Sequence, residues 1–198
     1  MKEAYETAGQ TQDRFQSWFV LGLGGSDGVW MTRNALRFGA ASDEWFRIAD
    51  VSGTVTALEF SEDGDYLWIG TSGGQVYRFT GFNDVYSPKK DYGNDVNDVG
   101  FFGDTLIDIT TGGTVQTTLT QITGFGGTIT DFAVEDDNDH VVVTVGGFSS
   151  GNKKVRECTN ATSASAIGDF TDITGSGATQ LPVGLPIYCA VIQKDNSG

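Results

Sequence analysis

Short runs of alternating apolar and polar residues recur along most of this sequence. Runs such as "TVTALEF", "YLWIGTS", "TITDFAV" and "VVVTV" have the β-branched and aromatic composition of strands. Glycine pairs punctuate the chain at Gly24-Gly25, Gly73-Gly74, Gly112-Gly113 and Gly146-Gly147, and each pair is followed by another short strand-like run. Because glycine reaches positive φ without a steric penalty, these pairs predict hairpin loops between the runs.

The runs group into a repeated unit of strand, acidic turn, strand, glycine turn and strand. In one copy "TVTALEF" leads through "SEDGD" to "YLWIG", and in another "TITDFAV" leads through "EDDNDH" to "VVVTV". A fourth run follows in at least two copies, as "EWFRIAD" and "DFTDITG". Four antiparallel strands that recur at about 35–50 residues are typical of β-propeller blades, so we predict an all-β chain built of such blades.

The repeat divides the chain into a polar N-terminal segment and a propeller segment. The polar segment covers residues 1–17 and the propeller segment covers residues 18–198. Within it we predict blades at approximately 18–50, 51–95, 96–127 and 128–175, with the start of a next blade at 181–198.

One phrase occurs twice in the sequence and marks the same corner in two blades. "GVWMTRNAL" begins at Gly28, and its echo "KVRECTNAT" begins at Lys154. Upstream, "WFVLGLGG" matches "HVVVTVGG", and downstream, "WFRI" matches "FTDI". Both phrases end in a polar corner that contains Asn-Ala, which indicates two copies of one structural unit.

These stretches resemble known propellers. "VTALEFSEDGDYLWIGTSGGQVYRF" resembles WD40 and related blades, and the echoed phrases with "LPIYCAVIQKDNSG" resemble the sortilin-like and BNR-type propellers of large secreted bacterial proteins that use type IX secretion. In that family an Asp-box-like corner joins the third and fourth strands of a blade. Asn34-Ala35 and Asn160-Ala161 stand at that corner here, followed by Trp45 or Phe170. The resemblance implies an extracellular or cell-surface location. The strict Asp-box, Ser-x-Asp-x-Gly-x-x-Trp, is absent, which weakens any transfer of glycosidase activity.

The two ends of the propeller segment fall at different points of a blade. The first recognisable strand, Trp18 to Leu23, matches the second strand of a blade, and the last, Ile187 to Gln193, matches a first strand. Two arrangements follow. The chain is either a partial propeller within a larger protein, or a closed four-bladed ring whose C-terminal strand completes the first blade. We favour the partial propeller, because propellers of the family that it resembles usually continue further.

The charge excludes some partners and leaves others open. With 26 acidic against 12 basic residues, the formal net charge is −14, so the chain lacks the basic surface that nucleic acid and anionic membranes require. No run is long and apolar enough to predict a transmembrane helix. The ordinary role of such acidity is solubility, and its functional roles are binding of a divalent cation or of a basic partner.

Acidic residues in the turns between first and second strands are the candidates for chemistry. "EDDNDH" has the composition, but not the spacing, of a calcium-binding EF-hand loop, so Asp136, Asp137 and Asp139 are the weak metal candidates, with Ca²⁺ as the ion. We predict no other cofactor and no catalytic set. The wider group of acids considered comprises Glu59, Glu62, Asp63, Asp65, Asp131, Glu135, Asp136, Asp137 and Asp139, most of which we expect to be turn formers. We expect His140 to be a rim or core residue rather than a general base.

Blade repetition without a convergent catalytic set favours a non-enzymatic interaction or structural module that binds protein or glycan, within a larger chain or assembly. The alternative is a glycoside hydrolase of the sialidase or xyloglucanase type, which rests on the Asp-box-like corners and needs two carboxylates across a groove. A cytosolic WD40-like scaffold is disfavoured. Cys158 and Cys189 match no metal-binding spacing, and we predict that both are buried and reduced, with a disulfide between them as the alternative.

Overall fold

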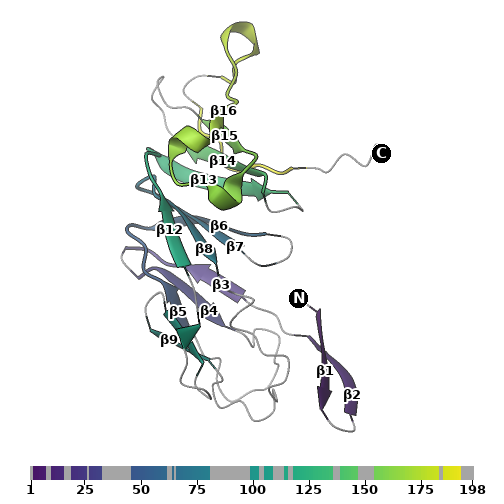
Figure 1. The fold of residues 1–198 in the computed structure, drawn as a ribbon. Helices are drawn as coiled ribbons and strands as arrows, with labels where there is room; N and C mark the ends of the chain where they lie inside the picture. Colours follow the sequence, from purple (N-terminus) through teal and green to yellow (C-terminus); the bar gives the residue numbers. More distant parts are fainter. Residues whose placement is uncertain are drawn as a thin grey trace.

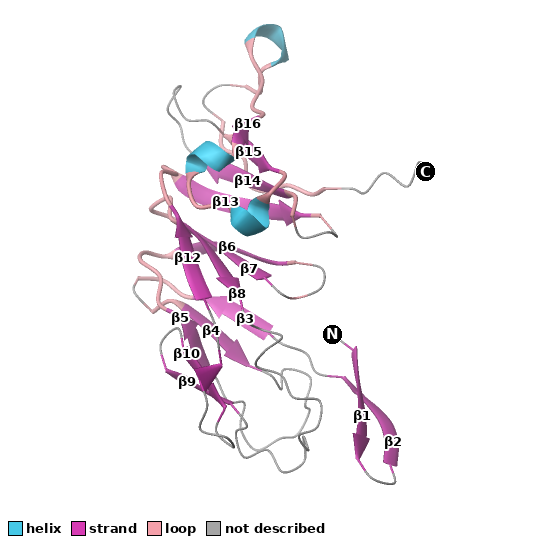
Figure 2. Cartoon of the chain, in the orientation of Figure 1, coloured by secondary structure: helices cyan, strands magenta, loops and turns pink. Residues whose placement is uncertain are grey.

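Antiparallel β-sheets account for most of the chain that the structure describes. The structure is a computed structural model, and it describes residues 2–7, 10–15, 19–25, 27–32, 46–61, 64, 66–80, 99–102, 105–108, 114–115, 118–135, 139–146, 154–182 and 185–192. Within these residues there is no α-helix; the helical turns are the 3₁₀ turns η1 (Ala161–Ser163), η2 (Ile167–Asp169) and η3 (Gly177–Thr179). Figure 2 shows strands and loops throughout, with these short turns near the C-terminal end. The predicted all-β class is confirmed.

The last sheet has the connectivity predicted for a propeller blade. Its four strands follow one another in sequence, and each pairs antiparallel with the next. They are β13 (Thr128–Val134), β14 (Val141–Gly146), β15 (Val155–Cys158) and β16 (Thr171–Asp172). The corner that contains Asn160-Ala161 joins β15 to β16, between the third and fourth strands as expected from the echoed phrase.

The middle sheet is also four-stranded, but its fourth strand comes from later in the chain than predicted. Its strands are β6 (Val55–Phe60), β7 (Tyr66–Thr71), β8 (Val76–Thr80) and β12 (Thr118–Ile122). The repeat predicts that residues 118–122 belong to a separate unit at 96–127, whereas β12 pairs with β8. A small sheet lies between them in sequence, made of β9 (Val99–Phe102), β10 (Thr105–Asp108) and β11 (Thr114–Val115). By pairing with β8, β12 supplies hydrogen-bond partners for the backbone groups on the open edge of that strand. The order of the strands along the chain does not predict this pairing.

The first sheet has three described strands and lacks an inner one. They are β3 (Phe19–Gly22), β4 (Val29–Thr32) and β5 (Phe46–Ala49). Asp27 and Gly28 lie in the hairpin between β3 and β4, where the Gly28 carbonyl accepts a hydrogen bond from the Leu23 N–H at 3.0 Å. Within the segment 1–17, β1 (Lys2–Thr7) and β2 (Gln10–Phe15) form a separate hairpin.

The first, middle and last sheets stack face to face in a row, with the middle sheet between the other two (Figure 1). Successive side chains of a strand point to opposite faces, so β7 contributes to both interfaces. Leu67 and Ile69 join the core that contains Val29 and Met31 of the first sheet. Trp68, between them, joins the core shared with the last sheet. This double burial explains why "YLWIGT" reads as a nearly continuous apolar run.

A glycine in the second strand of a sheet lets the inner strand of the next sheet approach closely. A Cβ at Gly22 would lie 2.2 Å from Val55 Cγ1, and a Cβ at Gly70 would lie 2.4 Å from Ile129 Cγ2. Both contacts join a second strand to the first residues of the following inner strand, in the stretches "GTVT" and "GTIT". The same sequence solution therefore packs both interfaces.

The inner strands β6 and β13 each have a β-bulge at the equivalent position. The pairing register shifts between Val55 and Ala57 in β6, and between Ile129 and Asp131 in β13. The bulged Thr56 donates its hydroxyl to the Ile129 carbonyl at 2.5 Å, which links the two sheets directly. β-bulges re-aim a side chain out of the regular ladder, and here the re-aimed hydroxyl joins neighbouring sheets.

The predicted C-terminal strand is not a strand in the structure. Residues 185–192 are extended but pair with no described strand, and the sheets do not close into a ring. The Ala190 N–H instead donates to Asp131 Oδ2 at 2.8 Å, which holds this C-terminal segment (185–192) near β13. Gln193 lies outside the described residues. A strand needs a partner edge, and no described edge runs beside this segment.

We predict that Gly70→Ala destabilises the protein by about 1–3 kcal/mol, the usual cost of overpacking a well-packed core, because its Cβ would overlap Ile129. Urea unfolding followed by tryptophan fluorescence measures the change. Gly126→Ala is the matched control, since a Cβ there meets nothing within 4 Å. Equal stability of the two variants would show that the sheets do not pack through this glycine.

Candidate functional site

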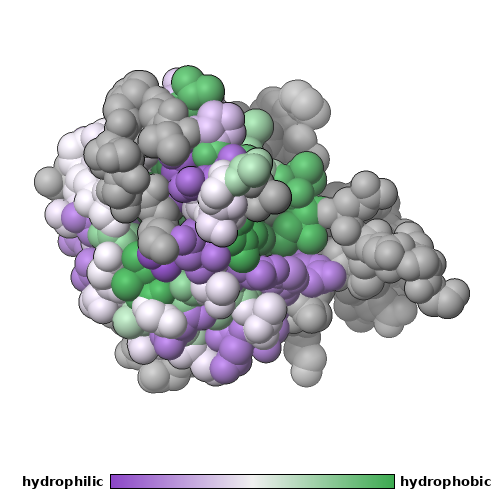
Figure 3. Space-filling model, turned by 90° about the horizontal axis from the view of Figure 1, so that it is seen from above, coloured by the Kyte–Doolittle hydropathy of each residue, from purple (hydrophilic) through white to green (hydrophobic). Residues whose placement is uncertain are grey.

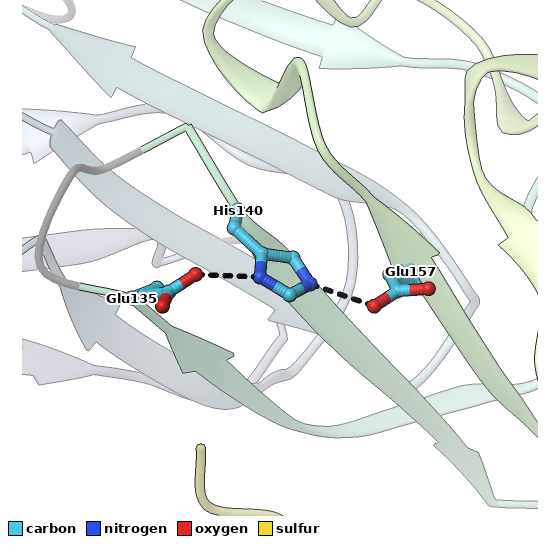
Figure 4. Close-up of polar contacts among 3 residues, drawn as sticks. All are labelled: Glu135, His140 and Glu157. Carbon is cyan, nitrogen blue, oxygen red and sulfur yellow. Dashed lines mark hydrogen bonds and ion pairs between the residues drawn. The ribbon is translucent and has the colours of Figure 1, made fainter. Parts of the chain in front are cut away.

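The most concentrated polar cluster in the described chain lies on the last sheet and centres on His140. This residue precedes β14, and it lies between Glu135, which follows β13, and Glu157 on β15 (Figure 4). Its Nδ1 lies 2.7 Å from Glu135 Oε2, and its Nε2 lies 2.8 Å from Glu157 Oε1. One imidazole therefore connects three adjacent strands.

The two carboxylates favour the protonated imidazole. Partial burial acts to lower the pKa of His140, but the hydrogen bonds and negative charges of Glu135 and Glu157 act in the other direction, and the net shift is upward. Only the imidazolium can donate through both ring nitrogens at once, which is what two flanking carboxylates require. A ring engaged on both sides has no nitrogen left to act as a base on a substrate, which agrees with the structural role expected for His140.

Asp139 holds the corner of the last sheet in place. Its Oδ1 accepts the Thr162 N–H at 3.1 Å and the Thr162 hydroxyl at 2.8 Å, and its backbone carbonyl accepts the Ala161 N–H at 2.8 Å. Asp169 closes the same connection, because its Oδ2 accepts the N–H groups of Ser165 and Ala166 at 2.8 and 3.0 Å. These bonds hold the pKa of Asp169 below its ordinary value.

The structure brings together no metal-binding group from the predicted candidates that it describes. Asp139 uses a carboxylate oxygen on Thr162, while Asp136 and Asp137 lie outside the described residues. Among the residues that can be placed, there is no cluster of three or more histidine, cysteine or acidic side chains. Glu62, Asp63 and Asp65 also lie outside the described chain.

Arg78 is a buried residue that the sequence analysis missed. It lies on β8, is 9% exposed, and donates from Nη1 to the carbonyls of Ala161 and Ala164 at the corner of the last sheet. Its guanidinium carbon lies 6.0 Å from the centroid of the Trp68 ring, which itself packs against Phe132. The sequence signal was an arginine inside the apolar run "VYRF", at a position that faces the next sheet.

Two of the predicted acids meet on neighbouring inner strands. Glu59 lies on β6 and Asp131 on β13, and burial, followed by the negative charge of Asp131, raises the pKa of Glu59. Asp131 Oδ2 also accepts the Ala190 N–H of the C-terminal segment. Glu59 remains exposed, so the pair lies at a surface where the two inner strands adjoin.

A buried lysine fixes the other end of that segment. Lys154 is 3% exposed, and its Nζ donates to the carbonyls of Pro182 and Leu185, both at 2.6 Å. Cys158 is buried and free, as predicted, whereas Cys189 is free but exposed, so the prediction of burial was wrong for Cys189. The error follows from treating 187–193 as a strand inside a sheet, which would have covered that side chain.

Phe170, the aromatic residue that follows the Asn160-Ala161 corner, belongs to the core. It is 2% exposed and meets Phe125 edge to face at a centroid distance of 5.2 Å. Asn34, Ala35 and Trp45, the equivalent residues of the first copy, lie outside the described residues.

The comparisons with known proteins give matches among solved structures and no sequence family. No protein-family model matches the chain, and no curated protein matches it. A solved structure to which the chain is similar is the β-propeller domain of Myceliophteria thermophila Cps50 (Swd1), at 14% sequence identity and a TM-score of 0.24. The match covers 73% of this chain and 64% of that one. At this TM-score the likeness adds nothing to the sheets described above, from which the propeller-like architecture follows.

Among the helices of the described chain, none has the length and apolar character needed to cross a membrane.

We predict that the His140 cluster stabilises the fold more in mild acid than in base. Because the folded-state pKa is raised, its contribution is fully present below the unfolded value of about 6.5 and is lost as the pH rises through the folded value. The stability difference between wild type and His140→Ala should therefore be larger at low pH, though within about 1 kcal/mol, since a partly exposed ion pair is screened by water. Urea titrations across this pH range measure it. In a Glu157→Gln background, the stability difference caused by His140→Ala should vary less with pH. If this difference in wild type instead grew as the pH rises, the ion-pair role of His140 would be wrong.

Proposed function

We propose that this chain is a non-enzymatic interaction module of a secreted or cell-surface bacterial protein, and that it binds protein or glycan. The observation that carries the proposal is that buried and half-buried polar side chains of the described residues form hydrogen bonds between strands and between sheets. Asp139, His140 and Arg78 each connect strands or sheets. Such a framework fixes the strands and sheets that carry the surface turns, which is what a binding scaffold requires.

The acidic turns between first and second strands are the proposed contact surface. They include "SEDGD" and "EDDNDH", in a chain whose net charge is −14. A concentrated negative field attracts a basic protein surface and accelerates its association. A neutral glycan would instead be recognised by hydrogen bonds and stacking, without this electrostatic attraction. The resemblance to sortilin-like and BNR-type propellers supports the extracellular or cell-surface location.

We expect binding to a basic protein to fall with salt and with loss of these acids. Pull-downs from cell-surface extracts and a glycan array supply candidate ligands, and binding of each is then measured at about 0.15 and 0.5 M salt, where screening differs strongly. The test variant combines Glu62→Gln, Asp63→Asn, Asp136→Asn and Asp137→Asn. The control variant makes an equal charge change elsewhere, through Glu3→Gln, Glu6→Gln, Asp13→Asn and Asp27→Asn.

Selective weakening of protein binding in the test variant supports a basic protein partner. Array binding that neither salt nor the test variant changes supports a glycan. If neither assay gives a ligand while hydrolase turnover is measurable, the proposed function is wrong.

The Glu59–Asp131 pair is the one observation that favours the alternative, a glycoside hydrolase. A general acid for glycoside cleavage needs a raised pKa beside a second carboxylate, and Glu59 has a raised pKa next to Asp131. Asp131, however, accepts the Ala190 N–H, so one of its oxygens is already engaged.

If the alternative held, Glu59→Gln would reduce turnover of glycosides with unactivated leaving groups by at least about 100-fold, the usual worth of a general acid. Hydrolysis of a panel of oligosaccharides, followed by release of reducing sugar, measures it. Glu157→Gln is the control, since that residue bonds His140 away from the pair. Wild-type protein without turnover on any substrate excludes this function.

A further inference from the structure

Among the described residues, the first sheet has no inner strand of the kind that the middle and last sheets possess. In the middle and last sheets, β6 and β13 pair antiparallel with the strands that follow them, β7 and β14. β3 corresponds to β7 and β14, because each of the three leads through a glycine-containing turn into the next strand of its sheet. In the described sheet, however, β3 is the edge strand.

The residues of β3 are more exposed than the equivalent residues of β7 and β14, which an inner strand covers. β7 is buried from Leu67 to Thr71, and β14 is buried at every position except Val142. None of the four residues of β3 is fully buried, and Phe19 is 49% exposed. The apolar residues of β3 therefore have the composition of a covered strand in a position that is only partly covered.

The C-terminal segment lies against the last sheet and has the sequence of an inner strand, but it has no neighbouring strand among the described residues. Its sequence "PIYCAVIQ" aligns with "TITDFAVE" of β13, which places Ile187 at the position of Ile129. The segment is extended but pairs with no described strand, and Lys154 and Asp131 hold it against the last sheet. It is thus an inner-strand sequence that lacks a partner strand among the described residues.

Its exposed side chains are largely apolar. Leu185, Tyr188 and Val191 are 60%, 74% and 89% exposed. Seen from this end of the row of sheets, hydrophobic residues reach the surface beside hydrophilic ones (Figure 3). In a strand, Leu185 and Val191 would lie on one face and Tyr188 on the other, so apolar side chains would be available on both faces. An extended segment of this kind is suited to strand addition, in which backbone hydrogen bonds and side-chain burial act together.

We propose that the C-terminal segment of one copy of this chain adds to β3 of a second copy as its missing inner strand, so that copies associate head to tail. The first and last sheets lie on opposite sides of the middle sheet in Figure 1, and the small sheet of β9 to β11 lies beside β5. A second copy can bring the two together, whereas one copy would have to bend into a ring. The new interface would continue the stacking of sheets already present twice within one copy, as a heterologous contact. This inference goes beyond the proposed binding function and does not depend on it.

The alignment fixes the register of the added strand. Val191 takes the position of Ala133, which pairs with Val142 in the last sheet, and Val142 corresponds to Val20 in the echoed stretches. Val191 of one copy should therefore lie opposite Val20 of the next. Directly opposed Cα atoms in antiparallel strands are about 4.5–5.5 Å apart, within the range that a disulfide spans.

Disulfide trapping between two single-cysteine proteins tests the proposal. Both carry Cys158→Ala and Cys189→Ser; one adds Val20→Cys, and the other adds Val191→Cys and a tag that changes its mass. We expect that mixing them in a glutathione redox buffer gives severalfold more heterodimer than either homodimer. Thr171→Cys, on an exposed position of β16, replaces Val191→Cys in the control mixture and should give no such excess.

Two results would overturn the proposal. One is heterodimer formation no greater than in the control mixture. The other is a cross-link within single molecules when Val20→Cys and Val191→Cys are combined in one chain at high dilution, which would mean that the chain closes on itself. In the unmodified protein, light scattering should show association that rises with concentration, that Val191→Lys reduces and that Thr171→Lys leaves unchanged. None of these assays uses a ligand, so they remain informative if the proposed binding function fails.

Discussion

The contact between Gly70 and Ile129 is the constraint on which the arrangement of the sheets depends. Any Cβ at Gly70 would lie well inside the van der Waals contact distance of Ile129 Cγ2, so only glycine permits this separation of the middle and last sheets. Gly22 and Val55 impose the same limit between the first and middle sheets. With the sheets this close, Thr56 can reach the Ile129 carbonyl and Arg78 can reach the corner beyond β15.

Burying Arg78 between sheets has a cost that the structure offsets in part. Its Nη1 finds two carbonyls and its guanidinium faces Trp68, but Nε of Arg78 and Nε1 of Trp68 are buried without a protein partner among the described residues. A buried donor that lacks a partner costs on the order of 1–3 kcal/mol. The arginine therefore contributes specificity to the interface, since a carbonyl-lined corner in the right place is the condition for burying its charge.

The polar residues of the last sheet stabilise the sheet itself. His140 connects three strands, Asp139 anchors the corner, and Lys154 holds the C-terminal segment by two backbone carbonyls. Histidine, aspartate and lysine are residue types that serve in catalytic sites. In this sheet, however, their lone pairs and protons are used in hydrogen bonds within the fold. Within the described chain, the surface that remains for partners includes turns, the edge strand β3 and the extended segment 185–192.

Local pattern determined most strands of the first, middle and last sheets and the corner at Asn160, because alternation, β-branched composition and paired glycines act within a few residues. It also placed Phe170 after that corner and Cys158 in a strand. It missed β1 and β2 and predicted a strand at 187–193 that does not form. The tertiary structure decided which strands share a sheet: β12 joins β8 from across an intervening sheet, and residues 185–192 remain without a strand partner. It likewise decided that Arg78 is buried and Cys189 exposed. Such outcomes depend on which edges and faces meet in space, and contacts between residues far apart in the chain leave no periodic signal in the sequence.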